Sequence, residues 1–182
     1  APVARMLLER RLREGKEDAA RLRERTGEAG RSRPQGSLTW IHGASVGESL
    51  SVLPLVARMK AQDPALNVLV TTGTVTSAKL MAERLPAGAI HQFIPVDHPR
   101  FVRGFLDHWR PDKVLFVESE FWPNLLIETR RRARQCKARV GRHDKGYAAI
   151  ALRCAIAGHR NGARRDRRAH AGRPVLSAGG AR

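Results

Sequence analysis

Between residues 38 and 132, short apolar runs alternate with longer segments in which apolar positions recur every three or four residues. Short apolar runs are typical of buried strands, and the longer period is typical of helices packed on one face. The pattern predicts strands at 38–42, 68–71, 90–94 and 114–117, and helices at 47–61, 75–85, 97–109 and 123–132. This alternation favours parallel pairing with helices on both faces, so we expect an α/β, Rossmann-like sheet.

The two ends of the chain follow other patterns. Residues 4–26 place a few apolar positions among many charges, which predicts a surface-lying helix interrupted near Gly15, and 27–36 predict a Gly- and Pro-containing linker. After residue 132 the apolar periodicity stops, and 135–146 hold too few apolar residues for a fifth strand. We therefore expect three parts: an N-terminal helix and linker (1–36), the Rossmann-like domain (37–132) and a basic, disordered or non-native tail (133–182).

Charge is distributed unevenly along the chain. Of the net charge of +17, residues 1–129 contribute only +3, with 18 Lys and Arg against 15 Asp and Glu. The last 53 residues contribute +14, which is typical of a basic tail and assigns no function to the body. A basic nucleic-acid-binding protein is kept as an alternative, but aromatic residues are only 5% of the chain and no nucleic-acid motif occurs.

Candidate chemistry lies at two strand ends. Glu48 follows the first predicted strand through a turn of small residues, and Glu118 and Glu120 follow the fourth. Ligands of open parallel sheets bind at the carboxyl ends of the strands, so these acids are candidate site residues. The start of a helix would favour the charged form of Glu48 by about 0.3–1 kcal/mol, as a general base requires. A helix-start glutamate with no function has the same signature.

The neighbours of these acids have candidate roles as well. Gly47 would let a ligand approach the backbone closely, and Ser45 would either cap the helix or touch the substrate. Glu118 and Glu120 are two residues apart and point to opposite faces of a continuing strand, and spacing does not say which one faces the site. The loop at 71–74 lacks the glycine pattern of a nucleotide site, and the scattered histidines indicate no metal site.

Four motifs together resemble one known family: Ile-His-Gly-Ala-Ser-Val-Gly-Glu-Ser-Leu-Ser-Val-Leu-Pro at 41–54, Thr-Thr-Gly-Thr-Val-Thr at 71–76, Pro-Val-Asp-His-Pro at 95–99 and Val-Glu-Ser-Glu-Phe-Trp-Pro-Asn at 117–124. They resemble, in order and spacing, the acceptor-side domain of the 3-deoxy-D-manno-octulosonic acid (Kdo) transferases. The likeness extends from about residue 12 to residue 132.

The resemblance implies the N-terminal half of a two-domain glycosyltransferase of the B type. Such an enzyme moves Kdo from CMP-Kdo onto the lipid A precursor at the cytoplasmic face of the inner membrane. It implies that Glu48 is the general base and that Glu118 stabilises the transition state. CMP-Kdo would be the donor, no cofactor or metal is implied, and the expected partners are the lipid A precursor and the membrane surface, with no specific nucleic acid.

Two departures from the family pattern shape the expectations for this chain. The family's hydrophobic N-terminal anchor and its second, CMP-sugar-binding domain have no counterpart in these 182 residues. The Arg-, Ala- and Gly-rich tail resembles a GC-rich reading frame translated out of register. We therefore expect this chain alone to be inactive, and an inactive fragment of a disrupted gene is the alternative interpretation.

Overall fold

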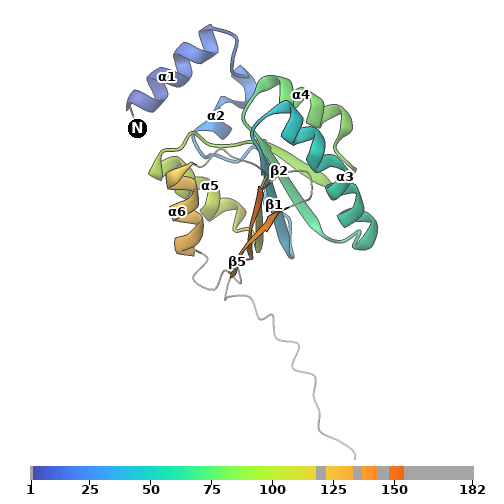
Figure 1. The fold of residues 1–182 in the computed structure, drawn as a ribbon. Helices are drawn as coiled ribbons and strands as arrows, with labels where there is room; N and C mark the ends of the chain where they lie inside the picture. Colours follow the sequence, from blue (N-terminus) through green and yellow to red (C-terminus); the bar gives the residue numbers. More distant parts are fainter. Residues whose placement is uncertain (1, 118–121, 133–136, 143–147, 154–182) are drawn as a thin grey trace, which may run out of the picture.

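A computed structural model describes residues 2–117, 122–132, 137–142 and 148–153 of the chain (Figure 1). Four parallel strands form the centre of the fold and are joined by helices. The strands are β1 (Leu38–Gly43), β2 (Asn67–Thr72), β3 (Ala89–Phe93) and β4 (Lys113–Val117). The helices are α3 (Val46–Gln62), α4 (Val75–Arg84), α5 (Pro99–Trp109) and α6 (Pro123–Arg132). Each element predicted from the sequence is present, with its ends within two residues of those expected, so the Rossmann-like fold class is confirmed.

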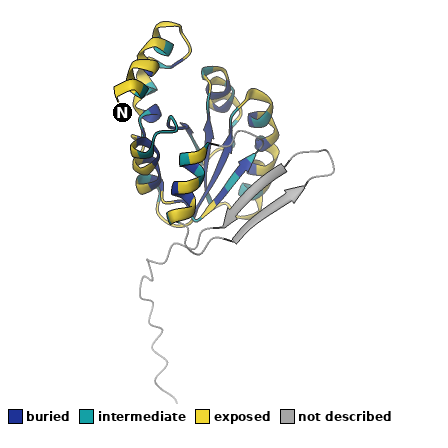
Figure 2. Cartoon of the chain, turned by 60° about the vertical axis from the view of Figure 1, so that its left-hand side comes forward, coloured by how far each residue is buried: buried dark blue, intermediate teal, exposed yellow. Residues whose placement is uncertain are grey.

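The sheet separates two hydrophobic clusters, one on each face. On one face, α5 and α6 pack against Trp40 and Leu69, and on the other α3 and α4 pack against Ile41 and Val70. Neighbouring residues of a strand point to opposite faces, which is why a single strand supplies both clusters. Figure 2 shows the result as buried strands between helices whose outer sides are exposed.

The order of the strands creates a reversal in the middle of the sheet. The described part of the sheet runs β3-β2-β1-β4-β6-β5. The chain therefore moves outward from β1 to β3 and then returns, through α5, to place β4 on the other side of β1. Consequently the helices that follow β1 and β4 cover opposite faces, and the loops at the carboxyl ends of these two strands diverge. Such a switch point is where open α/β sheets bind their ligands.

The N-terminal segment begins with α1 (Pro2–Arg13) and continues through a 3-10 turn (Ala19–Arg21) into the short helix α2 (Leu22–Arg25). The predicted interruption falls where expected, because Gly15 has a φ of +69°, a conformation that favours glycine. Residues after α2 also pack on the domain. A Cβ on Gly27 would lie 2.0 Å from the carbonyl oxygen of Phe101, so this position admits only glycine at that backbone separation.

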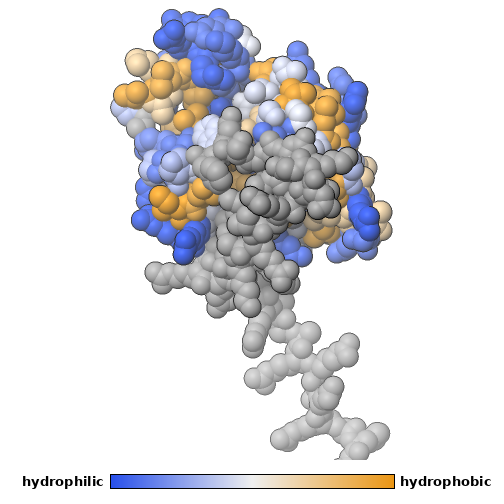
Figure 3. Space-filling model, in the orientation of Figure 1, coloured by the Kyte–Doolittle hydropathy of each residue, from blue (hydrophilic) through white to orange (hydrophobic). Residues whose placement is uncertain are grey.

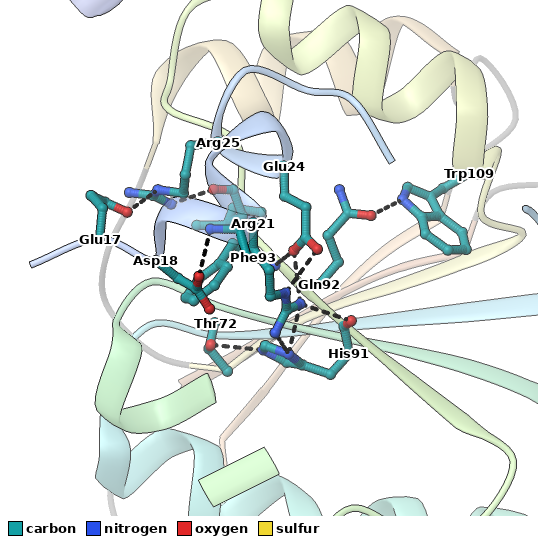
Figure 4. Close-up of polar contacts among 12 residues, drawn as sticks. Glu17, Asp18, Arg21, Glu24, Arg25, Thr72, His91, Gln92, Phe93 and Trp109 are labelled. Carbon is teal, nitrogen blue, oxygen red and sulfur yellow. Dashed lines mark hydrogen bonds and ion pairs between the residues drawn. The ribbon is translucent and has the colours of Figure 1, made fainter. Parts of the chain in front are cut away.

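Charged side chains of this segment cover the open edge of β3 (Figure 4). The Phe93 amide donates a 2.7 Å hydrogen bond to Glu24 Oε2, and Arg21 Nη2 donates to the His91 carbonyl at 3.2 Å. Arg21 and Glu24 also form a salt bridge at 2.8 Å. Unpaired backbone groups at a sheet edge invite pairing with other chains, and here side chains satisfy them. The N-terminal segment is thus tied to the sheet by hydrogen bonds.

The expectation that residues 135–146 supply no strand is wrong. The structure places β5 (Lys137–Arg142) and β6 (Ala148–Arg153) on the sheet, with β6 antiparallel to β4. The physical reason is that β6 covers the free edge of β4 and β5 pairs in turn with β6, through backbone hydrogen bonds that do not require apolar periodicity in the added strand. The rest of the predicted tail, including residues 154–182, lies outside the described residues.

We expect Glu24→Ala to lower the free energy of unfolding by about 1–3 kcal/mol, because the buried Phe93 amide and Arg21 lose their shared acceptor. Glu24→Gln should cost less, since the amide oxygen still accepts from Phe93. Urea unfolding followed by circular dichroism measures both. Glu83 is an exposed residue of α4, so Glu83→Ala is the control. Equal stability of Glu24→Ala and Glu83→Ala would contradict the role of Glu24 at the edge.

Candidate active site at the carboxyl ends of β1 and β4

The loop between β1 and α3 carries three of the four predicted site residues to the switch point. Gly43 pairs with Val117 of β4, so the two strands end side by side. Ser45, Gly47 and Glu48 follow within the next five residues, at the start of α3. Glu118 directly follows β4, but it and Glu120 lie outside the described residues, so the structure says nothing of their side chains.

Ser45 and Glu48 form a reciprocal capping box at the N-terminus of α3. The Glu48 amide donates to Ser45 Oγ at 3.2 Å, and Glu48 Oε2 accepts from the Ala44 amide at 2.5 Å and the Ser45 amide at 3.3 Å. Both donors would otherwise lack a partner in the first turn of the helix. The predicted capping role of Ser45 is confirmed, while a contact of Ser45 with substrate stays a prediction.

Only one of the two oxygens of the Glu48 carboxylate takes part in this cap. Its Oε2 holds the two loop amides, but Oε1 has no partner among the described residues, and the side chain is partly exposed. Gly47 beside it is exposed, and a Cβ built on it would meet nothing within 4 Å. The backbone there is open to an approaching molecule. The arrangement therefore presents one carboxylate oxygen, without a partner among the described residues, at the switch point.

Directly behind this loop lies a buried polar cluster that the sequence did not identify. His42 Nδ1 lies 3.1 Å from the Thr71 carbonyl and 3.0 Å from Thr71 Oγ1, which also accepts from the Trp40 indole at 2.8 Å. A carbonyl only accepts, so its contact favours the proton on Nδ1. His42 Nε2 is buried without a partner in the described part of the chain.

Burial lowers the pKa of His42 to about 4, although the neighbouring charge of Glu48 acts in the opposite direction. The imidazole is therefore neutral at pH 7 and joins the first two strand ends without adding a charge to the site. The sequence signal was a polar pair, His42 and Thr71, at the ends of otherwise apolar strands. These contacts are those of a structural histidine.

A second missed feature fixes the start of α6, next to the segment that carries Glu118. The carboxylate of Asp97 accepts from the Asn124 amide at 3.1 Å and the Leu125 amide at 2.8 Å. In return the Asn124 side chain donates to the Asp97 carbonyl at 3.0 Å. Two of the sequence motifs, at 95–99 and 117–124, are thus clamped together. The sequence feature that could have indicated this contact is Asp97, an acid just before the Pro-initiated helix α5, together with Asn124, an amide at the start of the Pro-initiated helix α6.

The described residues contain no group of three or more His, Cys, Asp or Glu side chains placed to hold a metal ion. His91, His98 and His108 lie apart and contact neighbouring protein groups. What the site offers is a carboxylate, backbone amides and small residues. This chemistry suits proton abstraction from a hydroxyl group at the edge of a parallel sheet.

Fold and site together define an α/β domain of the Rossmann type with a carboxylate at its topological switch point. The profile of the 3-deoxy-D-manno-octulosonic-acid transferase (Kdo transferase) family matches residues 20–144. The match covers more than half of the chain, which therefore belongs to this family.

Individual relatives agree with this assignment. A 3-deoxy-D-manno-octulosonic acid transferase of Rickettsia felis is 46% identical over 118 residues, 62% of this chain and 24% of the relative. That of Rickettsia bellii is 40% identical over 135 residues, 74% and 32% respectively. The "Probable 3-deoxy-D-manno-octulosonic acid transferase, mitochondrial" of Arabidopsis thaliana is 40% identical over 118 residues, 65% and 26%. The chain spans about a quarter to a third of the length of these relatives.

Stability should fall as the pH is lowered below about 6.5. Burial lowers the pKa of His42 to about 4, and burial together with Arg21 lowers that of His91 to about 3. Between pH 6.5 and these values the unfolded chain binds protons that the folded chain excludes. The contribution of each histidine to the free energy of unfolding is therefore fully present above pH 6.5. As the pH falls below 6.5, this contribution decreases by up to about 1.4 kcal/mol per pH unit for each histidine.

Urea unfolding at pH 7, 6 and 5 measures this slope. His91→Gln should reduce the slope, because one of the two histidines no longer titrates in the unfolded state. Lys79→Gln, an exposed change in α4 with no group titrating in this range, should leave the slope unchanged. Identical slopes for the parent and His91→Gln would show that His91 is not held neutral by the fold.

Proposed function

We propose that this chain forms the acceptor side of an enzyme that transfers Kdo from CMP-Kdo to the lipid A precursor, with Glu48 as the general base. The observation that carries the proposal is the position of Glu48 at the switch point, with one carboxylate oxygen held by the loop amides and the other without a partner among the described residues. Family membership supplies the class of reaction.

In the proposed reaction, Glu48 Oε1 takes the proton from a glucosamine hydroxyl of the acceptor. The oxygen of that acceptor hydroxyl then forms a bond to the anomeric carbon of Kdo. The bond from the anomeric carbon to the phosphate oxygen of CMP breaks, so CMP leaves with the electron pair. Anchoring Oε2 on the Ala44 amide fixes the direction of the accepting oxygen. Glu118, in the loop after β4, is proposed to stabilise positive charge that develops at the anomeric carbon.

The surroundings of Glu48 fit an acceptor with apolar chains. Val46 and Leu50, one turn apart at the start of α3, are 37% and 39% exposed although both are large apolar residues. They flank Gly47 and Glu48 on the first turns of the helix, so an acceptor hydroxyl at the carboxylate would have apolar surface beside it. Ser45, at the cap, and Gly47 are the proposed acceptor-binding positions.

α1 supports contact with a membrane surface. Val3, Met6 and Leu7 are 64%, 59% and 49% exposed, and the same helix ends in several arginines. Figure 3 shows apolar side chains gathered at α1 and along the side of α3. Exposed apolar groups beside basic ones are typical of helices that lie in an anionic lipid interface. The proposed location is accordingly the cytoplasmic face of the inner membrane.

No helix among the described residues combines the length and the apolar character that crossing a bilayer requires.

The test of the base is Glu48→Gln in a chimera that joins residues 1–132 to the part of the Rickettsia felis relative beyond the matched region. Glutamine keeps the capping box, because its amide oxygen can accept from Ala44 and Ser45, but it cannot take a proton at neutral pH. With CMP-Kdo and the lipid A precursor as substrates, turnover should fall by about 10²–10⁴-fold relative to the parent chimera.

Three further variants and one binding measurement separate chemistry from structure. Ser45→Ala removes the cap and should lower stability by about 1 kcal/mol with a smaller effect on turnover than Glu48→Gln. Glu118→Gln should reduce turnover strongly and Glu120→Gln only mildly. Acceptor binding, measured by titration of the 182-residue chain, should change little in Glu48→Gln. Near-parental turnover of that variant would make Glu118 the first candidate for the base.

A further inference from the structure

A pocket of about 560 Å³ lies along the β3 edge of the sheet, away from the carboxyl ends that carry Glu48. Its wall is formed by the α2 segment, the end of α4 with the turn after it, and β3 from Ala89 to Gln92. β2 separates β3 from β1, and Ala89 is at the amino end of its strand. The pocket is therefore distinct from the proposed transfer site, and its volume is in the range of small-molecule sites.

The wall of this pocket is positively charged. Arg21, Arg23 and Arg31 line it, whereas Glu24 is its carboxylate. Glu24 is already bound to Arg21 through both of its oxygens. No side-chain partner of Arg23 or Arg31 exists among the described residues, and both are exposed. Since burial lowers the pKa of His91 to about 3, that lining histidine is neutral, and two guanidinium groups are left without a carboxylate partner in the described part of the chain.

An unpartnered buried donor stands at the same wall. Gln92 is 1% exposed, and its Oε1 accepts from the Trp109 indole at 2.8 Å. An indole nitrogen only donates, so this contact fixes the oxygen toward Trp109 and the amide nitrogen away from it, as Figure 4 shows. That nitrogen has no partner in the described part of the chain. A buried donor without an acceptor is uncommon, and this one adds to the polar character of the wall.

The remaining lining is apolar. Met81 and Leu85 of the α4 end and Ile90 of β3 contribute to the wall. A ligand that fits must therefore combine an anionic, hydrogen-bond-accepting group with a small apolar body. Two free arginines match the charge of a phosphate monoester, which is about −1.5 to −2 at pH 7, better than that of a single carboxylate.

We propose that the pocket between α2, α4 and β3 is a binding site for a small organic phosphate monoester, held by Arg23 and Arg31 with its apolar part against Met81, Leu85 and Ile90. This site goes beyond the proposed Kdo transfer and uses none of its residues. Ligand bound there would bridge the N-terminal segment to the edge of the sheet.

The test uses the full 182-residue chain and phenyl phosphate as the probe, with inorganic phosphate for comparison. The indole N–H of Trp109 reports locally in ¹H–¹⁵N spectra, because it donates to Gln92 at the pocket wall. We expect a saturable shift with phenyl phosphate and weaker binding of inorganic phosphate. In the double variant Arg23→Gln/Arg31→Gln, the affinity should fall by about tenfold or more, as two charge-assisted contacts are lost.

The matched control is Arg58→Gln/Arg130→Gln, which removes the same charge from exposed positions of α3 and α6 that do not line the pocket. It should bind phenyl phosphate as the parent does, and it also corrects for phosphate bound by the basic C-terminal residues. Equal losses in the two double variants, or no saturable shift below about 10 mM phenyl phosphate, would overturn the proposal. So would binding seen only with phosphatidic acid vesicles, which would indicate a lipid surface instead of a small-molecule site.

Discussion

Parallel pairing of β1 with a strand on each side is the constraint on which the rest of the molecule depends. Every residue of β1 is buried, and its register with β2 and β4 brings the three strands to an end at one level. Because β2 and β4 are reached in opposite directions along the sheet, the chain must leave β1 toward one face and β4 toward the other. The opening at this reversal follows from topology alone, before any side chain is considered. The side chains then close it from behind, since Trp40, His42 and Thr71 form a hydrogen-bonded cluster between the ends of β1 and β2.

Under the proposed function, Glu48 serves both the stability of α3 and the chemistry of the site. A glutamate at the third position of a helix is favoured by the capping box, so its presence alone does not indicate catalysis. The two carboxylate oxygens of Glu48 differ in their contacts. Oε2 accepts from the Ala44 and Ser45 amides and forms the cap, whereas Oε1, the oxygen of the proposed base, is left without a partner among the described residues. The cap also restricts the side chain to one orientation, which is what a positioned base requires. A residue at this place can therefore stabilise the helix and still present a free oxygen to a substrate.

The sequence predicted the central domain closely because short apolar strands and amphipathic helices leave a strong periodic signal. The position of Glu48 and the capping role of Ser45 could be predicted for the same reason, since both depend on residues within one turn of each other. The Asp97–Asn124 clamp and the His42–Thr71 contact join residues 27 to 29 positions apart, and no local pattern encodes them. β5 was missed because the hydrogen bonds of its backbone are indifferent to side-chain type. The roles of Glu118 and Glu120 stay predictions, because the structure does not describe those residues.

The two edges of the parallel sheet are completed by different physical means, and this difference explains why a pocket lies at the β3 edge. At the β4 edge, another strand takes up the free backbone groups. At the β3 edge, Arg21 and Glu24 bind the backbone through side chains, while Arg25 binds the Ile94 carbonyl and forms a salt bridge with Glu17. Side chains reach the edge from a distance and do not fill the space as a strand would. A pocket with exposed arginines beside an apolar wall is the geometric consequence of completing a sheet edge in this way.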